Sequence, residues 1–107
     1  MTEKPITWLG SSLADVRAFP DLARRRADHE LGFVQLGVHP TDWRPMHDVG
    51  PGVREIRVHT ERQHRVLYVA HFAEAVYVLH AFEKKTRKTR QSDLELARKR
   101  LKLIRQL

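Results

Sequence analysis

The sequence predicts an α+β fold: a small, curved, mainly antiparallel sheet with helices packed on one side, in the order β-α-α-β-β-β-α. Apolar residues recur every three or four positions between residues 21 and 38, as on one face of a helix. Three segments rich in Val, Ile, Tyr and Phe follow between residues 53 and 82, and their connections are short enough to require antiparallel neighbours. The chain has 107 residues, so we expect a single domain over residues 1–107.

The N-terminal part of the chain is predicted to form one strand and a short helix. Residues 5–9 (Pro-Ile-Thr-Trp-Leu) are rich in apolar and β-forming residues, and Gly10 follows them. Ser12 and Asp15 have the spacing of a helix N-terminal capping pair, so a first helix is expected to run to about Phe19.

A second helix is predicted to begin at Pro20, because proline suits the first turn of a helix. Gly37 and Pro40 mark its end. Its buried stripe would consist of Ala23, Ala27, Leu31, Val34 and Val38. The composition of residues 39–52 predicts a loop that is pinned to the core by Trp43, Met46 and Val49.

The three β segments, at residues 53–60, 64–72 and 75–82, are predicted to form an antiparallel meander. Apolar and polar residues alternate in the first segment, so one face should be buried and the other polar, with Glu55, Arg57 and His59. The other two segments are apolar on both sides, as central strands of a covered sheet are.

The last helix is predicted to run from about Asp93 to the C-terminus, with Ser92 and Glu95 forming a capping box at its start. One apolar face, expected to pack on the sheet, contains Leu94, Ala97, Leu101 and Ile104. A second apolar face is either part of a wide core or a surface for a protein partner, and contains Leu96, Leu103 and Leu107.

The basic residues are concentrated in the second half of the chain. Residues 1–53 contain six Lys or Arg and seven Asp or Glu, whereas residues 54–107 contain fourteen and six. The whole chain carries a formal net charge of +7. This segregation favours a polyanionic partner, of which nucleic acid is the usual one, over a merely soluble basic surface.

Several classes of function are excluded by what the chain lacks. There is no cysteine, so a disulfide framework, a thiolate zinc site and a thiol nucleophile are excluded. There is no phosphate-binding loop, nucleophile elbow or helical metalloprotease motif, and we expect neither a metal nor a cofactor. Without a long apolar run or a basic leader segment, a cytoplasmic protein is expected.

The remaining candidates for a functional site are cations on the predicted strands. In an antiparallel meander, the start of the second strand lies beside the ends of the first and third. We therefore expect convergence near one end of the sheet of Arg57, His59, Arg65, Lys84 and Lys85. Such a site can hold an RNA phosphate while the adjacent 2′-hydroxyl attacks it, because guanidinium groups are planar donors with a permanent charge. Coincident surface basicity is the alternative explanation.

Five short segments occur in a specific order along nearly the whole chain. They are Phe19-Pro20, Trp43-Arg-Pro-Met46, Val49-Gly-Pro-Gly-Val-Arg-Glu-Ile-Arg57, His64-Arg-Val-Leu-Tyr68 and Val78-Leu-His-Ala-Phe-Glu-Lys-Lys-Thr-Arg-Lys-Thr89. Together they resemble HigB-type toxins, the phage-related branch of the RelE/ParE superfamily.

This resemblance implies a RelE-like fold and the toxin of a bacterial type II toxin–antitoxin module, with a HigA-like helix-turn-helix antitoxin as its partner. The implied activity is ribosome-dependent, metal-independent cleavage of mRNA. The catalytic residues would be Arg57, His59, Arg65 and Lys85. RNA binding would fall to Lys84, Arg87, Lys88 and Arg90, and binding of the antitoxin to Leu96, Leu103 and Leu107.

The sequence departs from the family pattern near its C-terminus. RelE-type enzymes often carry a tyrosine, or a tyrosine and a histidine, near the C-terminus, but here neither residue type follows His80. The acid and base therefore stay open among His59, His80 and Lys85. Two other functions also stay open: a ParE-like gyrase inhibitor, and a non-catalytic module that binds RNA or the ribosome.

Overall fold

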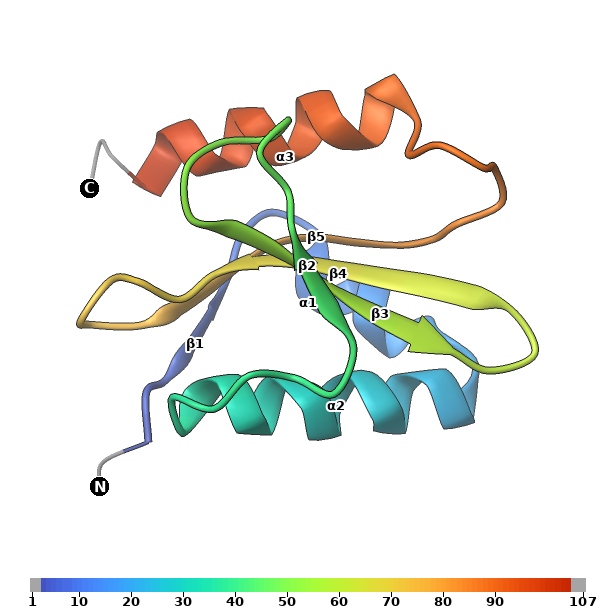
Figure 1. Cartoon of the computed structure of the whole chain (residues 1–107), viewed down its shortest axis with the longest axis horizontal. Helices are drawn as coiled ribbons and strands as arrows, with labels where there is room; N and C mark the ends of the chain where they lie inside the picture. The colour runs from blue at the N-terminus through green and yellow to red at the C-terminus, as the bar shows by residue number, and fades with distance from the viewer. Residues whose placement is uncertain (1–2, 105–107) are drawn as a thin grey trace.

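The structure, a computed structural model, describes residues 3–104. Its sheet has five strands in the spatial order β1-β5-β4-β3-β2 (Figure 1). The strands are β1 (Ile6–Trp8), β2 (Trp43–Pro45), β3 (Val53–His59), β4 (Gln63–Val69) and β5 (Val76–Glu83), and the helices are α1 (Ser12–Arg17), α2 (Asp21–Gln35) and α3 (Gln91–Ile104). β1 runs parallel to β5, and the other neighbours are antiparallel. The predicted α+β class, its element order and the meander are confirmed, with one additional strand.

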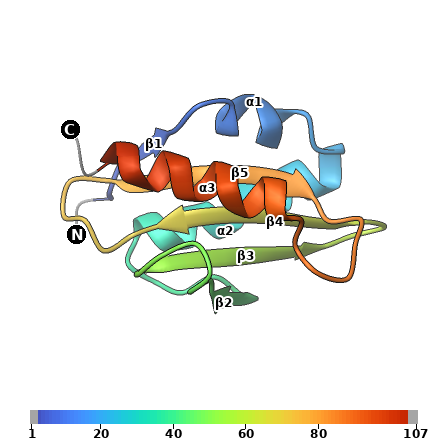
Figure 2. The same ribbon diagram turned by 90° about the horizontal axis from the view of Figure 1, so that it is seen from above.

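Helices cover both faces of the sheet, so the prediction that they pack on one side is wrong (Figure 1). One core contains Ala27 and Leu31 of α2 with inward-facing residues of β3 and β4. The other core, on the opposite face, contains Leu94 and Ala97 of α3 together with Leu79 of β5. The physical reason is visible in the sequence: β4 and β5 are apolar on both faces, and both faces therefore need cover from water. Figure 2, viewed from the side of α3, shows this helix over β5 and β4, with β3 and β2 further along the sheet.

The additional strand lies in the segment that was predicted to be a loop. Trp43 pairs with Ile56 and Arg44 pairs with Glu55, so β2 extends the sheet beyond β3. Pro45 is compatible with this position because β2 is an edge strand, where a missing N–H breaks no ladder. Met46 and Val49 are buried as predicted, and Trp43 is half-buried.

Both predicted helix caps are wrong. The Ser12 hydroxyl is buried and donates to the carbonyl oxygen of Val78 on β5, so it ties α1 to the sheet and does not cap the helix. α3 begins at Gln91, one residue before the predicted Ser92 cap, and the backbone N–H groups of Asp93 and Leu94 donate to the carbonyl oxygen of Arg90.

α2 has the predicted buried stripe except at its last member. Ala23, Ala27, Leu31 and Val34 are buried, but Val38 is exposed because α2 ends at Gln35. Gly37, at φ +80°, turns the chain away after the helix. Between residues 3 and 104, no helix has the length and apolar character needed to span a membrane.

A side chain from α3 protects the outer edge of β5. β1 pairs only with residues 76–78. Beyond them, Nη1 of Arg100 donates to the carbonyl oxygen of Leu79 at 2.8 Å, and Nη2 donates to Oγ of Ser11 at 3.1 Å. A Cβ at Gly10 would lie 2.5 Å from Nε of Arg100, and the φ of Gly10 is +54°. Glycine is therefore required where the chain passes this guanidinium.

Candidate functional site

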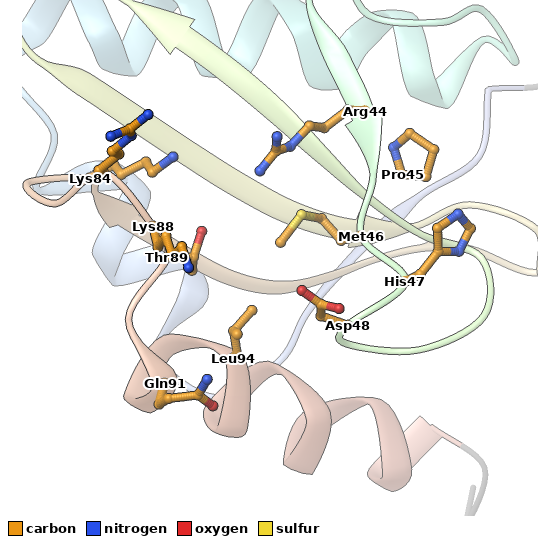
Figure 3. Close-up of a pocket in the computed structure, with 11 residues that line it drawn as sticks. Arg44, Pro45, Met46, His47, Asp48, Lys84, Lys88, Thr89, Gln91 and Leu94 are labelled. Carbon is orange, nitrogen blue, oxygen red and sulfur yellow. The ribbon is translucent and has the colours of Figure 1, made fainter.

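A cleft of about 820 Å³ lies between β2, the loop after it, the β5–α3 connection and the start of α3 (Figure 3). Its lining includes four cationic side chains, those of Arg44, Lys84, Arg87 and Lys88. In Figure 3 the side chains of Arg44 and Lys84 extend toward each other over the sheet. The cleft is therefore a concave surface on which positive charge is concentrated.

The strand register brings two further cations close to Arg44 and Lys84, although neither of them lines the cleft. Arg57 on β3 lies directly opposite Arg65 on β4. The backbone N–H of Lys84 donates to the carbonyl oxygen of Gln63 at 2.7 Å, which keeps the chain after β5 beside the start of β4. The structure thus brings Arg57, Arg65 and Lys84 together, and Arg44 joins them from β2. We refer to Arg44, Arg57, Arg65 and Lys84 as the cation cluster.

A buried carboxylate holds two members of the cation cluster in place. Glu55 on β3 is fully buried, at 0% exposure. Its Oε1 accepts a hydrogen bond from Nε of Arg44 at 3.2 Å and lies 3.6 Å from Nε of Arg65. The expectation that Glu55 belongs to an exposed polar face is wrong, because the two arginines and the neighbouring strands cover it.

Arg65 is the most deeply buried cation of the cluster, with 3% exposure. Its Nη1 donates to the carbonyl oxygen of His64 at 2.9 Å. Burial lowers the pKa of Arg65, and the neighbouring carboxylate of Glu55 opposes this shift. A guanidinium stays protonated at neutral pH even so, and Arg65 is therefore a fixed, poorly hydrated positive charge.

Lys84 differs from the arginines because it can lose its proton. Burial lowers the pKa of Lys84, and the charges of Arg65, Arg44 and Arg57 lower it further, whereas Glu55 raises it. A lysine in such surroundings releases a proton more readily than an exposed lysine does, and can take part in proton transfer.

Two members of the cluster, Arg57 and Lys84, make no ion pair within residues 3–104, although Arg57 lines a separate small pocket with Glu30 and Asp42. Nε of Arg57 is buried without a hydrogen-bond partner. The side chain of Lys84 makes no hydrogen bond or ion pair with another described residue, whereas Glu55 serves Arg44 and Arg65. Positive charge that the fold leaves unpaired is what an external anion would bind.

Two residues expected to be catalytic have other neighbours. Lys85 is exposed, and its Nζ lies 3.7 Å from Oε2 of Glu83. Nε2 of His59 lies 2.7 Å from Oδ2 of Asp42, at the exposed end of β3. The structure does not gather either side chain into the cleft.

The other cations of the basic run lie in the β5–α3 connection. Arg87 and Lys88 line the cleft, whereas Arg90 is exposed outside its lining. The hydroxyl oxygen of Thr89, which also lines the cleft, is buried without a partner. This connection therefore forms a basic rim along one side of the cleft.

His80 anchors the start of α3 and does not line the cleft. Its Nε2 lies 2.7 Å from Oδ1 of Asp93 in the first turn of the helix, and its ring stacks on Phe82. Because α3 supplies one wall of the cleft, this contact supports the shape of the site from behind.

The second apolar face of α3 is uncovered in the described part of the chain. Leu103 is 50% exposed, and Leu96 is half-buried and lines a shallow groove with Arg98, Lys99 and Lys102. The third expected residue of this face, Leu107, lies outside the described residues. The first face packs on the sheet as predicted, with Leu94, Ala97, Leu101 and Ile104 buried.

Sequence reasoning missed Arg44 and Glu55 as parts of the site. Arg44 lies between Trp43 and Pro45 in a segment whose composition is that of a loop, so nothing local indicated a strand facing β3. The sequence offers only a weak indication that Glu55 is buried, which is that it lies between the apolar residues Val53 and Ile56 on a strand with a buried face.

The fold and the cleft together define a class of protein. It is a small, basic α+β protein in which cations from three strands and a connecting segment lie close together beside a cleft.

Comparison with known proteins identifies the family. Residues 14–102 match the family described as Phage derived protein Gp49-like (DUF891), and the chain therefore belongs to that family. It is a toxin-like family of toxin–antitoxin systems. The matched residues run from α1 to α3 and include the whole cation cluster. No curated protein matches the sequence.

Proposed function

We propose that this protein is a HigB-type toxin of the RelE/ParE superfamily that cleaves mRNA on the ribosome without a metal ion. The observation that supports this proposal most directly is the cation cluster, in which Arg57 and Lys84 have no acidic partner among the described residues. An RNA phosphodiester would supply the missing negative charge. Membership of a toxin-like family agrees with such an activity.

In the proposed reaction, the 2′-oxygen of one ribose attacks the adjacent phosphorus. A bond forms between the 2′-oxygen and phosphorus while the bond to the 5′-oxygen breaks, and the departing 5′-oxygen takes a proton from water, which leaves a 2′,3′-cyclic phosphate and a 5′-hydroxyl. Arg57 and Arg65 neutralise the charge that builds up on the phosphate oxygens. Lys84, through its lowered pKa, takes the proton from the 2′-hydroxyl. DNA lacks this hydroxyl and would resist cleavage.

The remaining cations would guide the RNA strand. Arg87 and Lys88 at the rim, with Arg90 beside them, are placed to contact phosphates on either side of the scissile bond. His59 and Lys85 lie outside the cleft and are assigned the same supporting role.

Arg57→Ala tests the proposal most cleanly. We expect cleavage to fall about a hundredfold, because one donor to the transition state is lost. The free energy of unfolding should change little, because Arg57 has no acidic partner among the described residues. Cleavage would be measured by primer extension on a defined transcript, with translating ribosomes and with free RNA. Arg25→Ala, which removes an exposed arginine of α2 that pairs with Asp21, is the matched control and should cleave like the wild type.

The other outcomes of this experiment are equally informative. Equal cutting of free RNA and of the translated transcript would contradict ribosome dependence, and full activity of Arg57→Ala would contradict the assigned site. Double-strand breaks and altered plasmid topology without cut mRNA would indicate a ParE-like gyrase inhibitor. Salt-sensitive RNA binding without cleavage would indicate a non-catalytic module.

We assign the second apolar face of α3 to a HigA-like, helix-turn-helix antitoxin. The face combines exposed Leu103 and half-buried Leu96 with neighbouring cations, which suits an apolar segment with acidic flanks. Leu103→Glu is expected to weaken binding of the adjacent gene's product at least about tenfold, since an interface anchor is lost. Affinity would be measured by titration with the purified proteins. Leu22→Glu, a change at a leucine of α2 that is 64% exposed, should bind normally, and equal weakening by both variants would refute the assignment.

A further inference from the structure

The cleft has two halves of different chemistry. Arg44, Lys84, Arg87 and Lys88 form a cationic half, whereas Met46, Asp48, Gln91 and Leu94 form a half without a cation. In Figure 3 the side chains of Met46, Asp48 and Leu94 point into the same space, beside the cationic half. A site for phosphate alone needs only the first half, so the second half requires its own explanation.

Two nearly buried side chains form the apolar part of the second half. Met46 and Leu94 are only 6% and 5% exposed, and they belong to the core under α3. They come from opposite walls of the cleft, one following β2 and the other in the first turns of α3. A nucleobase has apolar faces, and a methionine thioether makes favourable contacts with aromatic rings.

The polar part of the second half is an acceptor without a partner. The carboxylate of Asp48 makes no hydrogen bond or ion pair with any residue in the described range 3–104, although four cations line the same cleft. Its backbone is held in place, because Nε of Arg98 on α3 donates to the carbonyl oxygen of Asp48 at 2.7 Å. The loop thus presents two free carboxylate oxygens to the cleft from a fixed position.

We infer that the cleft binds one nucleotide of the RNA substrate and selects guanine at that position. The phosphate would bind to Arg44, the base would pack on Met46 and Leu94, and its Watson–Crick edge would bind to Asp48. A volume of about 820 Å³ lies within the range of small-molecule pockets. This inference rests on the proposed function, which supplies RNA as the ligand.

Guanine follows from the chemistry of a carboxylate, which only accepts hydrogen bonds. Guanine carries two adjacent N–H donors on its Watson–Crick edge, one for each carboxylate oxygen. Adenine and cytosine place an acceptor beside their single amino donor, and uracil flanks its one N–H with two carbonyl oxygens. For these bases, one carboxylate oxygen would face another acceptor and lose a hydrogen bond. Gln91 and Thr89 lie in the same lining and can hydrogen-bond to other atoms of the nucleotide.

The test compares cut sites of the wild type and Asp48→Asn. Each protein is expressed in cells, and the 5′-hydroxyl ends of transcripts are sequenced, so that base frequencies around each cut are compared with transcript composition. The wild type is expected to show guanine enriched at one fixed position relative to the cut. In Asp48→Asn this enrichment should fall about tenfold relative to the other bases, because the amide replaces one acceptor with a donor. Asp28→Asn, the same change at an exposed position of α2, should keep the wild-type pattern.

Two results would overturn the guanine site and leave the nuclease proposal standing. One is wild-type cutting without a base preference, and the other is a guanine preference that Asp48→Asn retains. Absence of any cut transcript with the wild type would instead overturn the proposed function, and the guanine site with it. Loss of folding does not confuse the comparison, because Asp48 is exposed and its side chain makes no contact on which the described fold depends.

Discussion

Arg65→Ala is expected to abolish cleavage and to destabilise the fold, which is the largest combined effect of any single change in the cation cluster. The activity should fall about a thousandfold or more, because a fixed charge at the proposed phosphate site is removed. The free energy of unfolding should fall by about 3–5 kcal/mol, since Glu55 loses its buried partner while staying fully buried itself. Arg44, at 3.2 Å, would be left as the only arginine paired with that carboxylate in the described part of the chain.

Two further variants separate the catalytic loss from the loss of stability. Arg65→Lys keeps a buried positive charge near Glu55, so most of the stability should return, but the planar guanidinium is gone and cleavage should stay low. Arg62→Ala removes an exposed arginine of the β3–β4 turn, which pairs with Glu83, and should match the wild type in both measurements. Stability is measured by urea unfolding and activity by primer extension. A fully active Arg65→Lys would show that charge alone, without the guanidinium geometry, is sufficient.

Glu55→Gln is expected to disable the site while changing the shape of the core very little. Without the carboxylate, the side chains of Arg44 and Arg65 lose the acceptor that orients them, and we expect cleavage to fall between about tenfold and a hundredfold. The free energy of unfolding should fall by about 1–3 kcal/mol, because a buried charge-assisted contact is lost.

The pH profile gives a readout that a purely structural role would not change. Glu55 raises the pKa of Lys84, against the lowering effect of burial and the arginines. Removing its charge therefore lowers the pKa of Lys84 further. If Lys84 takes the proton in the reaction, the rate rises with pH as Lys84 deprotonates, and in Glu55→Gln this rise should move to lower pH. Glu61→Gln, an exposed change in the β3–β4 turn, is the control. An unshifted profile in Glu55→Gln would refute the link between Glu55 and Lys84.

The elements with strong periodicity could be predicted from the sequence. α2 was predictable because its apolar residues repeat with the period of a helix. The meander was predictable because its short connections allow only one pairing of the strands. β2 was not predictable, because a strand of three residues that includes Pro45 has no period of its own and exists only through pairing with β3. The position of α3 depends on which face of the sheet α1 and α2 occupy, and its sequence does not contain that information.

The candidate site also contains residues that could be predicted from the sequence and residues that could not. Arg57 and Arg65 lie on regular strands, and once the meander is assigned, their juxtaposition follows from register. The distinction between Lys84 and Lys85 lies beyond the end of β5, where alternation no longer decides which side chain turns inward. Glu55 could not be assigned to the site, because a glutamate on a strand is ordinarily exposed. Its burial depends on Arg44 of β2, a strand that could not be predicted from the sequence.

The guanidinium of Arg100, bonded to Leu79 and Ser11, has a consequence for how the molecule behaves in crowded solution. An open strand edge recruits strands from other chains, and here that edge is sealed by a residue that belongs to α3. Detachment of α3, whether by heat or by mutation of its apolar face, therefore exposes the edge of β5 and at the same time exposes the core between α3 and the sheet. We therefore expect variants that weaken the packing of α3 to self-associate through the edge of β5.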